Sequence, residues 1–277
     1  MKKRDVLLVC ILIMLGNKTH SQVTMLSSNP MQKNQFIAYI SCQYCKTHDT
    51  YNWTYNTYEQ IPIDDRVGIF SMLTMMGYGV TDKLSMYVQY PIYDQGINSE
   101  HSFYGGEFVL MSRYAIIPSS SEKTGLTLIG ALRFPTTAAD YHPFADNTID
   151  LIFGEIFSTA WYGNWRTHIK SELYINTRSS LNENPGEIFR VLLKQDLKLG
   201  KIKFYLNNIY SYKCNNRDEN NEIIVNTQKQ SLLHILGAEF VLWDNFHIKP
   251  KFQVFSVGKG GTIFRNKFIL ELFYYFN

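Results

Sequence analysis

Charged side chains recur at every second position in several segments of this chain, and apolar side chains stand between them. In residues 246–257, for example, Lys249 and Lys251 alternate with Ile248 and Phe252. Side chains two apart in an extended strand share one face, so these charges would line one face of a sheet. That face could be the solvated side of a sheet or the inner wall of a barrel.

A membrane-spanning barrel would place these charges in its lumen, because an arginine or lysine facing lipid at the bilayer midplane costs roughly 2–4 kcal/mol. Inside a barrel, charges of both signs could tune the selectivity of a polar pore, or they could fill a narrow interior as ion pairs. Both interpretations stay open. The alternation predicts these lumen-lining side chains: Glu107, Arg113, Arg133, His168, Lys170, Glu172, Arg190, Lys194, Asp196, Lys203, Glu239, Lys249, Lys251, Lys267 and Glu271.

The histidines and serines do not suggest a catalytic site. A hydrolase needs a nucleophile, a base and an orienting group within reach of one another. His168 and Ser171 are three positions apart and would point to opposite faces of a strand, and His101 and Ser102 fall in an expected loop. We therefore expect no enzyme and no catalytic residues, with an outer-membrane lipid hydrolase as the least favoured function.

Two groups of residues could in principle bind a metal ion. The loop at 137–150 holds Asp140, His142, Asp146 and Asp150, but their spacing matches no calcium loop and a solvated loop is favoured. Cys42 and Cys45 are separated by two residues, which places them on opposite faces of a strand, and no second such pair exists. We expect ordinary strand cysteines here, with Cys214 alike, and no metal or cofactor.

The elements that carry these residues are about twelve alternating segments separated by turn signals, with ten to fourteen possible. The short connections lie at 81–83, 118–124, 163–164, 200 and 244–245, and longer loops lie between them, at 47–65, 95–103, 137–148, 178–186, 214–230 and 258–262. Short turns that alternate with longer loops are typical of outer-membrane barrels. The expected strands are 35–46, 66–80, 84–94, 104–117, 125–136, 149–162, 165–177, 187–199, 201–213, 231–243, 246–257 and 263–276.

The two ends of the chain support a membrane barrel. Residues 267–277 place Phe268, Leu270 and Phe276 on one strand face, whereas chain termini are usually polar and frayed. A barrel ends on such a strand, because the last strand must face lipid and pair with the first. We expect 263–276 to pair with 35–46 on one edge and with 246–257 on the other.

The start of the chain resembles a secretory signal. A basic stretch is followed by an apolar run of about ten residues, and small residues at Thr19 and Ser21 permit cleavage before Gln22. The expected organisation is a signal peptide at 1–21, a periplasmic segment at 22–34 and a barrel at 35–277. The formal net charge of +3 indicates no nucleic-acid partner.

Tryptophans beside the short turns distinguish a membrane barrel from a soluble sheet. Indole rings are most stable at the boundary between lipid and water, where they form a girdle around a barrel. The expected girdle residues are Trp161, Trp165, Trp243, Tyr274 and Phe276. Segments 66–80 and 149–162 are less regular, because apolar residues occupy both of their faces.

Three stretches in the middle of the chain resemble the outer-membrane family named for the meta-pathway of phenol degradation, a set of transporters. They are a hairpin at 78–86, a strand at 105–114 and a strand end at 132–136. Glu107 and Thr137 depart from the aspartate and glycine usual in that family. The resemblance covers about residues 66–200 and implies a barrel with a proposed role in moving small, often hydrophobic, molecules, without catalytic residues.

These observations predict an all-β, antiparallel transmembrane barrel in the outer membrane of a Gram-negative bacterium. We expect a passive transporter or channel for small molecules, and the alternative is a non-conducting structural or surface-interaction barrel. Its expected partners are outer-membrane lipid and lipopolysaccharide, the barrel-assembly machinery during biogenesis, and an unknown small solute.

Overall fold

The structure is a computed structural model that describes residues 31–97, 100–118, 124–134, 149–161, 164–177, 185–243 and 245–276. The expected signal peptide and most of the expected periplasmic segment lie outside these residues, so their boundaries stay predictions. Within the described residues, no helix is long and apolar enough to cross a membrane.

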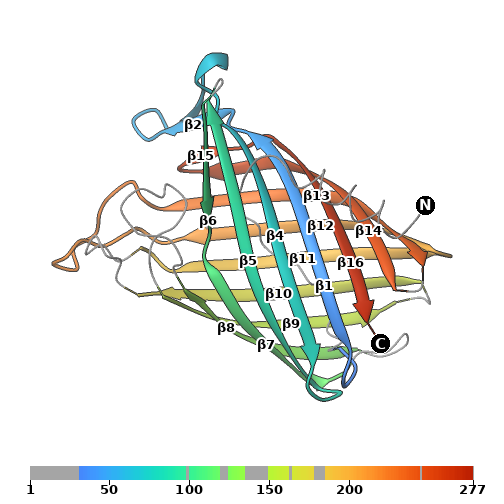
Figure 1. The fold of residues 1–277 in the computed structure, drawn as a ribbon. Coiled ribbons are helices and arrows are strands. Elements are labelled where there is room, and N and C mark those ends of the chain that lie inside the picture. Colours follow the sequence, from blue (N-terminus) through green and yellow to red (C-terminus); the bar gives the residue numbers. More distant parts are fainter. Residues whose placement is uncertain are drawn as a thin grey trace.

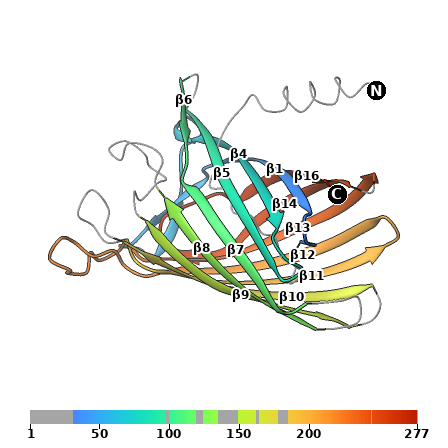
Figure 2. The same ribbon diagram turned by 60° about the horizontal axis from the view of Figure 1, so that its bottom comes forward.

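Twelve antiparallel strands form a closed barrel, which confirms the predicted fold class (Figures 1 and 2). Each strand binds its neighbours through backbone hydrogen bonds, and the β4–β5 pair completes the ring. The strands are β1 (Phe36–Lys46), β4 (Gly68–Gly79), β5 (Leu84–Ile97), β7 (Phe108–Ile117), β8 (Gly125–Phe134), β9 (Asp150–Ala160), β10 (Trp165–Asn176), β11 (Ile188–Leu199), β12 (Ile202–Lys213), β13 (Lys229–Trp243), β14 (Phe246–Lys259) and β16 (Asn266–Phe276).

The last strand pairs with the first, as the sequence predicts. Phe276 lies opposite Phe36, and the pairing runs to Lys267 opposite Cys45. On its other edge β16 pairs with β14, from Tyr274 opposite Phe246. The aromatic terminus is therefore held between two neighbours, as a closed barrel requires.

The two rims of the barrel differ. The short connections and both ends of the barrel chain lie at one rim, which we term the turn end, and the longer connections lie at the other, the loop end. Residues 31–35 fold back along the turn end, where the Asn34 amide donates to the Gly79 carbonyl. Gly79 is required there, since a Cβ on it would lie 1.8 Å from the Gln32 carbonyl oxygen.

Four sequence-based boundaries need correction. The expected strand 104–117 is two elements, β6 (Glu100–Gly105) and β7, because the chain kinks at Gly106, where a Cβ would collide with the Tyr93 ring. β6 pairs with the loop-end part of β5 and β7 with its turn-end part, so the expected loop at 95–103 is mostly a hairpin.

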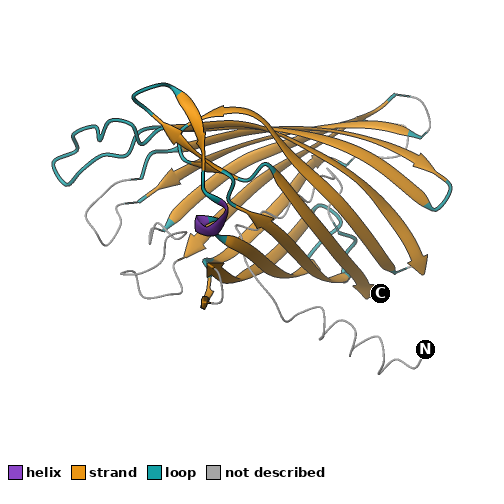
Figure 3. Ribbon diagram, turned by 90° about the horizontal axis from the view of Figure 1, so that it is seen from above, coloured by secondary structure: helices purple, strands orange, loops and turns teal. Residues whose placement is uncertain are grey.

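The expected loop at 47–65 also has structure. It contains β2 (Asp49–Asn52), β3 (Thr57–Gln60) and a short 3₁₀ helix, η1 (Ile63–Asp65). β2 pairs with β3 and with β15 (Thr262–Ile263), so Ile263 belongs to a small sheet at the loop end and not to the last barrel strand. Figure 3 shows the helix close to this small sheet, beside the barrel strands.

The outer face of the barrel is apolar all the way round. Each barrel strand exposes at least one large apolar side chain, and such a continuous apolar surface is far larger than soluble monomers present. These exposed side chains alternate along each strand with buried, inward side chains, because successive residues of a strand point to opposite faces. These outward side chains include Tyr44, Met76, Met86, Leu110, Leu128, Phe153, Ile169, Phe189, Phe204, Leu236, Phe252 and Phe268.

Two polar pairs interrupt this apolar belt, and in each pair the partners satisfy one another. The Ser171 hydroxyl donates to the Glu155 carboxylate over 3.1 Å. His234 Nδ1 and Asn208 Oδ1 lie 2.7 Å apart. Local pairing of this kind reduces the cost of polar groups within an apolar surface.

Candidate functional site

The inner face of the barrel has two parts with different chemistry. We call the inward faces of β10, β11, β12, β13 and β14 the charged wall, and the inward faces of β1, β4, β5, β7, β8 and β9 the apolar wall. β16 joins them, because it carries Glu271 as well as Phe273. The predicted lumen-lining residues point inward from both walls, but most of their ion pairs lie on the charged wall.

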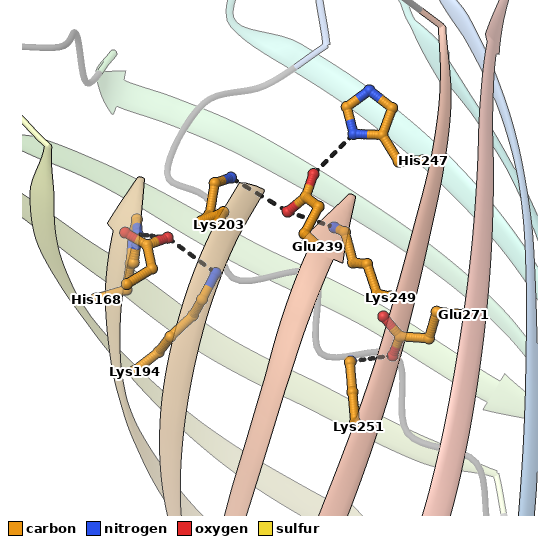
Figure 4. A network of polar contacts seen from close by, with 9 residues as sticks. His168, Lys194, Lys203, Glu239, His247, Lys249, Lys251 and Glu271 are labelled. Atoms are coloured by element: carbon orange, nitrogen blue, oxygen red, sulfur yellow. Dashed lines mark hydrogen bonds and ion pairs between the residues drawn. The ribbon is translucent and has the colours of Figure 1, made fainter. Parts of the chain in front are cut away.

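Four side chains near the turn end form what we term the lysine–glutamate cluster (Figure 4). The Nζ atoms of Lys203 and Lys249 each lie 3.2 Å from Oε2 of Glu239. Oε1 of the same carboxylate lies 2.7 Å from His247 Nδ1. The strands explain this convergence: β12, β13 and β14 are consecutive neighbours, and each presents its inward residue at the same level.

Positive charges outnumber negative charges in this cluster. One carboxylate pairs with two ammonium groups, so the cluster carries an excess positive charge even when His247 is neutral. Exposure is unequal too, since the Lys203 side chain is 33% exposed and that of Glu239 only 8%. The cationic groups therefore face the lumen, and the acid lies beneath them.

A second group connects β9, β10 and β11. His168 Nε2 lies 3.4 Å from Asp196 Oδ2, and the same oxygen lies 3.1 Å from Lys194 Nζ. His168 Nδ1 contacts the Ser158 hydroxyl at 2.6 Å. The order serine–histidine–aspartate is that of a nucleophile, base and orienting acid. However, Ser158 and His168 are both only 3% exposed, and Lys194 already pairs with the acid, so the contacts describe a packed polar network.

Ser171 and His168 point to opposite faces of β10, as their spacing predicts. Ser171 is on the outer face and donates to Glu155, so it is turned away from His168. The serine that does reach the imidazole is two residues from the end of the neighbouring strand, and no spacing within one segment could have revealed it.

Nearer the loop end, β10 and β11 hold a third group. Lys170 Nζ lies 2.6 Å from Glu172, and Arg190 lies 3.7 Å from the same carboxylate. Arg190 also donates to the Tyr174 hydroxyl over 2.7 Å. Lys251 pairs closely with Glu271 in the same wall. Each buried acid thus has a cation beside it, as buried charges require.

Arg133 is the centre of a group at the loop end of the apolar wall. It pairs with Glu107 at 2.8 Å and makes a close contact with Asp150. Asp150 is fully buried at the start of β9, which corrects its assignment to a solvated loop. Asp140, His142 and Asp146, the other possible ligands of that loop, lie outside the described residues.

Most of the apolar wall carries hydrocarbon in place of charge. We call the buried apolar side chains that pack together on this wall, along with Met31 and Phe273, the apolar cluster. Arg113 lies on the same wall, is 1% exposed, and has its guanidinium 5.8 Å from the centre of the Tyr87 ring. The cluster explains why 66–80 and 149–162 have apolar residues on both faces, because their inward side chains pack together within the barrel. Its members are Met31, Ile37, Tyr39, Leu73, Met75, Tyr87, Met111, Ile129, Ile156 and Phe273.

The walls meet between β14 and β16. Lys249 Nζ lies 3.9 Å from the centroid of the Phe273 ring, and that ring lies 4.5 Å from Tyr39. His247 lies 5.2 Å from the Tyr275 ring. The lysine–glutamate cluster is therefore in direct contact with the edge of the apolar cluster. Lys267 extends the inward face of β16 toward the loop end.

The expected girdle residues lie on the outer face at the turn end. Trp161 and Trp243 are 63% and 60% exposed, and Trp165, Tyr274 and Phe276 are also exposed. Tyr274 contacts Phe276, and Trp243 contacts Phe246, through their rings. Their role at a lipid interface stays a prediction.

The described residues contain no group of three histidine, cysteine or acidic side chains placed to hold a metal. Cys42 and Cys45 are both buried on β1. Cys214 lies beyond the end of β12, where burial and the Glu187 carboxylate raise the pKa of its thiol. A high thiol pKa reduces the thiolate fraction and so the reactivity.

An ion pair at the loop end connects the small sheet to the residue just before β16. Arg265 Nε lies 2.8 Å from Asp49 Oδ2, and His48 Nδ1 lies 2.8 Å from Asp49 Oδ1. Burial alone would raise the pKa of Asp49, but the hydrogen bonds from His48 and Arg265 outweigh it and hold the pKa below its ordinary value.

Neither a protein-family model nor a curated protein matches the sequence. The fold does match solved structures. An outer-membrane channel from Pseudomonas putida F1 has a TM-score of 0.78 at 9% identity, covering 93% of this chain and 100% of that one. The NanC porin matches with a TM-score of 0.55 at 7% identity, covering 86% of this chain and 98% of the porin. At such identities the likeness concerns the barrel fold alone.

Proposed function

We propose that this protein is an outer-membrane barrel that passively conducts small molecules. One observation carries the proposal: the barrel is apolar all round its outer face, whereas one wall of its interior is lined by charged side chains, which a soluble protein would place on its outside. Such a surface suits lipid around a polar interior. Similarity in fold to a channel and a porin supports the proposal, as does the resemblance of residues 66–200 to a transporter family.

The charged wall gives the conduit its polar surface. Lys194, Lys203 and Lys249 lie on β11, β12 and β14, each beside an acid that limits its desolvation cost. Rings of charged side chains of this kind set the selectivity of pores. The hydrophobic solutes implied by the family resemblance would instead contact the partly buried side chains at the rim of the apolar cluster, Ala131 and Tyr275.

Conductance tests the proposal. Purified protein in a planar bilayer should give discrete current steps, and vesicles that contain it should swell in small solutes. Arg190→Gln and Lys194→Gln should change the ratio of anion to cation permeability, whereas Arg217→Gln, at the exposed loop end, should not. A folded barrel without current or swelling would contradict the proposal.

A second candidate function is a non-conducting structural or surface-interaction barrel. The apolar cluster favours it, because ten side chains from seven barrel strands and the preceding segment pack together inside the ring. The structured loop end, with β2, β3 and β15, would then be the interaction surface. Intact binding to cells or partners in the absence of conductance would favour this candidate.

The proposed location implies lipid and lipopolysaccharide around the apolar belt and assembly by the barrel-assembly machinery. Cell fractionation with an intact signal segment would test both. The protein should be found in the outer-membrane fraction, and its amount there should fall when that machinery is depleted.

A further inference from the structure

The contact between the two walls gives the lumen a specific chemical preference. We propose that the lysine–glutamate cluster and the adjoining Tyr275 ring bind a small amphipathic monoanion, with its carboxylate on Lys203 and Lys249 and its apolar part on Tyr275 at the rim of the apolar cluster. This inference rests on the proposed conduit function, because it names the class of solute that the conduit would hold.

The hydrogen-bonding capacity of the cluster favours an anion. An ammonium group has three N–H donors, and each lysine gives one contact to Glu239. The Glu239 carboxylate already has two lysines and His247 around it. What the cluster still offers is therefore donors, and these require a ligand with acceptor oxygens.

The geometry fits one carboxylate. Both ammonium groups lie 3.2 Å from the same Glu239 oxygen, so they are separated by at most twice that distance. The two oxygens of one carboxylate can bridge donors so placed. The excess positive charge of the cluster would be neutralised by a single negative charge, which favours a monoanion over a dianion.

The apolar wall accounts for the rest of the ligand. Lys249 Nζ is 3.9 Å from the centroid of the buried Phe273 ring, and His247 is 5.2 Å from the partly exposed Tyr275 ring at the rim of the apolar cluster. A chain of several methylene groups would displace water from the Tyr275 ring, at about 0.8 kcal/mol per buried methylene. Acetate has the same negative charge as such a ligand but no alkyl chain to make this contact. Hexylammonium has the alkyl chain but carries a positive charge.

Block of the current by hexanoate tests the proposal. In planar bilayers, hexanoate should reduce the small-ion current at lower concentration than acetate, and hexylammonium should not block. Lys203→Gln removes the excess charge while Lys249 and His247 still surround Glu239, so the barrel should fold. We expect the half-blocking concentration of hexanoate to rise about tenfold, and Lys203→Arg should restore the block.

Lys259→Gln is the matched control, because this lysine stacks on Trp53 at the loop end, away from the cluster. Its half-blocking concentration should equal that of the wild type. Equal block by hexanoate and hexylammonium, or an unchanged block in Lys203→Gln, would overturn the proposal. Equal block by acetate would overturn the role of the apolar wall.

A barrel without current would fail as a conduit, and binding would then be measured directly. Equilibrium dialysis of hexanoate against the barrel in lipid nanodiscs, with empty nanodiscs as the blank, serves this purpose. If hexanoate binds the wild type but not Lys203→Gln, the proposed site stands even though the conduit function fails. Binding absent from the wild type would refute the site independently of the current.

Discussion

The two walls of the lumen follow the same strand alternation but use it differently. On the charged wall, inward side chains such as Asp196 and Glu239 pair across neighbouring strands. On the apolar wall, inward side chains such as Ile156 and Tyr87 pack as a core would. The contrast shows that a barrel interior can divide its tasks, with packing stabilising one side and charge defining the chemistry of the other.

The largest expected effect comes from the apolar wall. Ile156→Ala should lower the free energy of unfolding by about 4 kcal/mol, because a fully buried side chain leaves a cavity. Leu192→Ala is the control on the charged wall, where the buried cluster is smaller, and should cost about 2 kcal/mol. Urea midpoints of the two variants in lipid vesicles, measured by gel mobility, give the comparison. Equal losses would mean that both walls are packed alike.

The next effect comes from the charged wall. Glu239→Gln should cost about 3 kcal/mol, because Lys203, Lys249 and His247 lose their shared carboxylate. The triple variant with Lys203→Gln and Lys249→Gln as well should recover much of this stability, since no unpaired charge remains. Urea unfolding of the single and triple variants measures the difference. Full stability of the single variant would show that water alone solvates the lysines.

A glycine packs against a tyrosine ring in each wall, which allows a matched test. A Cβ at Gly77 would lie 2.5 Å from the Tyr87 ring and 2.8 Å from Ile37, so Gly77→Ala should cost about 2 kcal/mol. A Cβ at Gly237 would meet the Tyr205 hydroxyl at 2.5 Å. That hydroxyl is the far end of a side chain that can shift, so Gly237→Ala should cost about 1 kcal/mol.

Tyr205→Phe provides the control for the second glycine. The Tyr205 hydroxyl is buried without a hydrogen-bond partner among the described residues. Its removal takes away the nearest contact of the new Cβ but leaves Cζ and Cε2 of the ring at 2.6 Å and 2.8 Å. Gly237→Ala should therefore cost less, but not nothing, in the Tyr205→Phe background, as measured by thermal unfolding. An equal cost in both backgrounds would place the strain in the ring and the backbone.

The smallest effect concerns the small sheet that joins the loops of the two walls. Asp49 has a lowered pKa in the folded protein, so its pair with Arg265 stabilises the sheet above the ordinary aspartate pKa and is lost as pH falls through the folded value. We expect a lower amide protection factor at Tyr51, whose N–H donates to the Gly261 carbonyl, below about pH 4, for a loss of at most about 1 kcal/mol. Asp49→Asn should abolish this pH dependence.

Much of the fold could be predicted from the sequence, because alternation and turn spacing are local signals. Strands such as 165–177 sort their charges and apolar residues onto opposite faces, so their bounds were nearly correct. The pairing of β1 with β16 was predictable because a closed barrel must pair its first strand with its last. The apolar wall was ambiguous, since an inward Leu73 and an outward Met76 look the same in a sequence.

The site was predictable only in part. The inward charges followed from alternation, but the partners of each charge depend on the register between strands. Ser158 and His168 meet because their positions are paired across β9 and β10, which no single segment reveals. The small sheet at the loop end was missed because β2, β3 and β15 are short and their sequences lack a strong period.

The pairing of the first and last strands has a consequence for how the chain folds. Phe36 and Phe276 lie at opposite ends of the barrel sequence, so the ring closes through the longest-range contact that it contains. Contacts of this kind form slowly, because loop-closure entropy must be lost before they give any stability. Until β16 docks, two strand edges stay open to other chains, which makes the incomplete barrel prone to aggregation. A chain truncated before β16 would present both edges permanently.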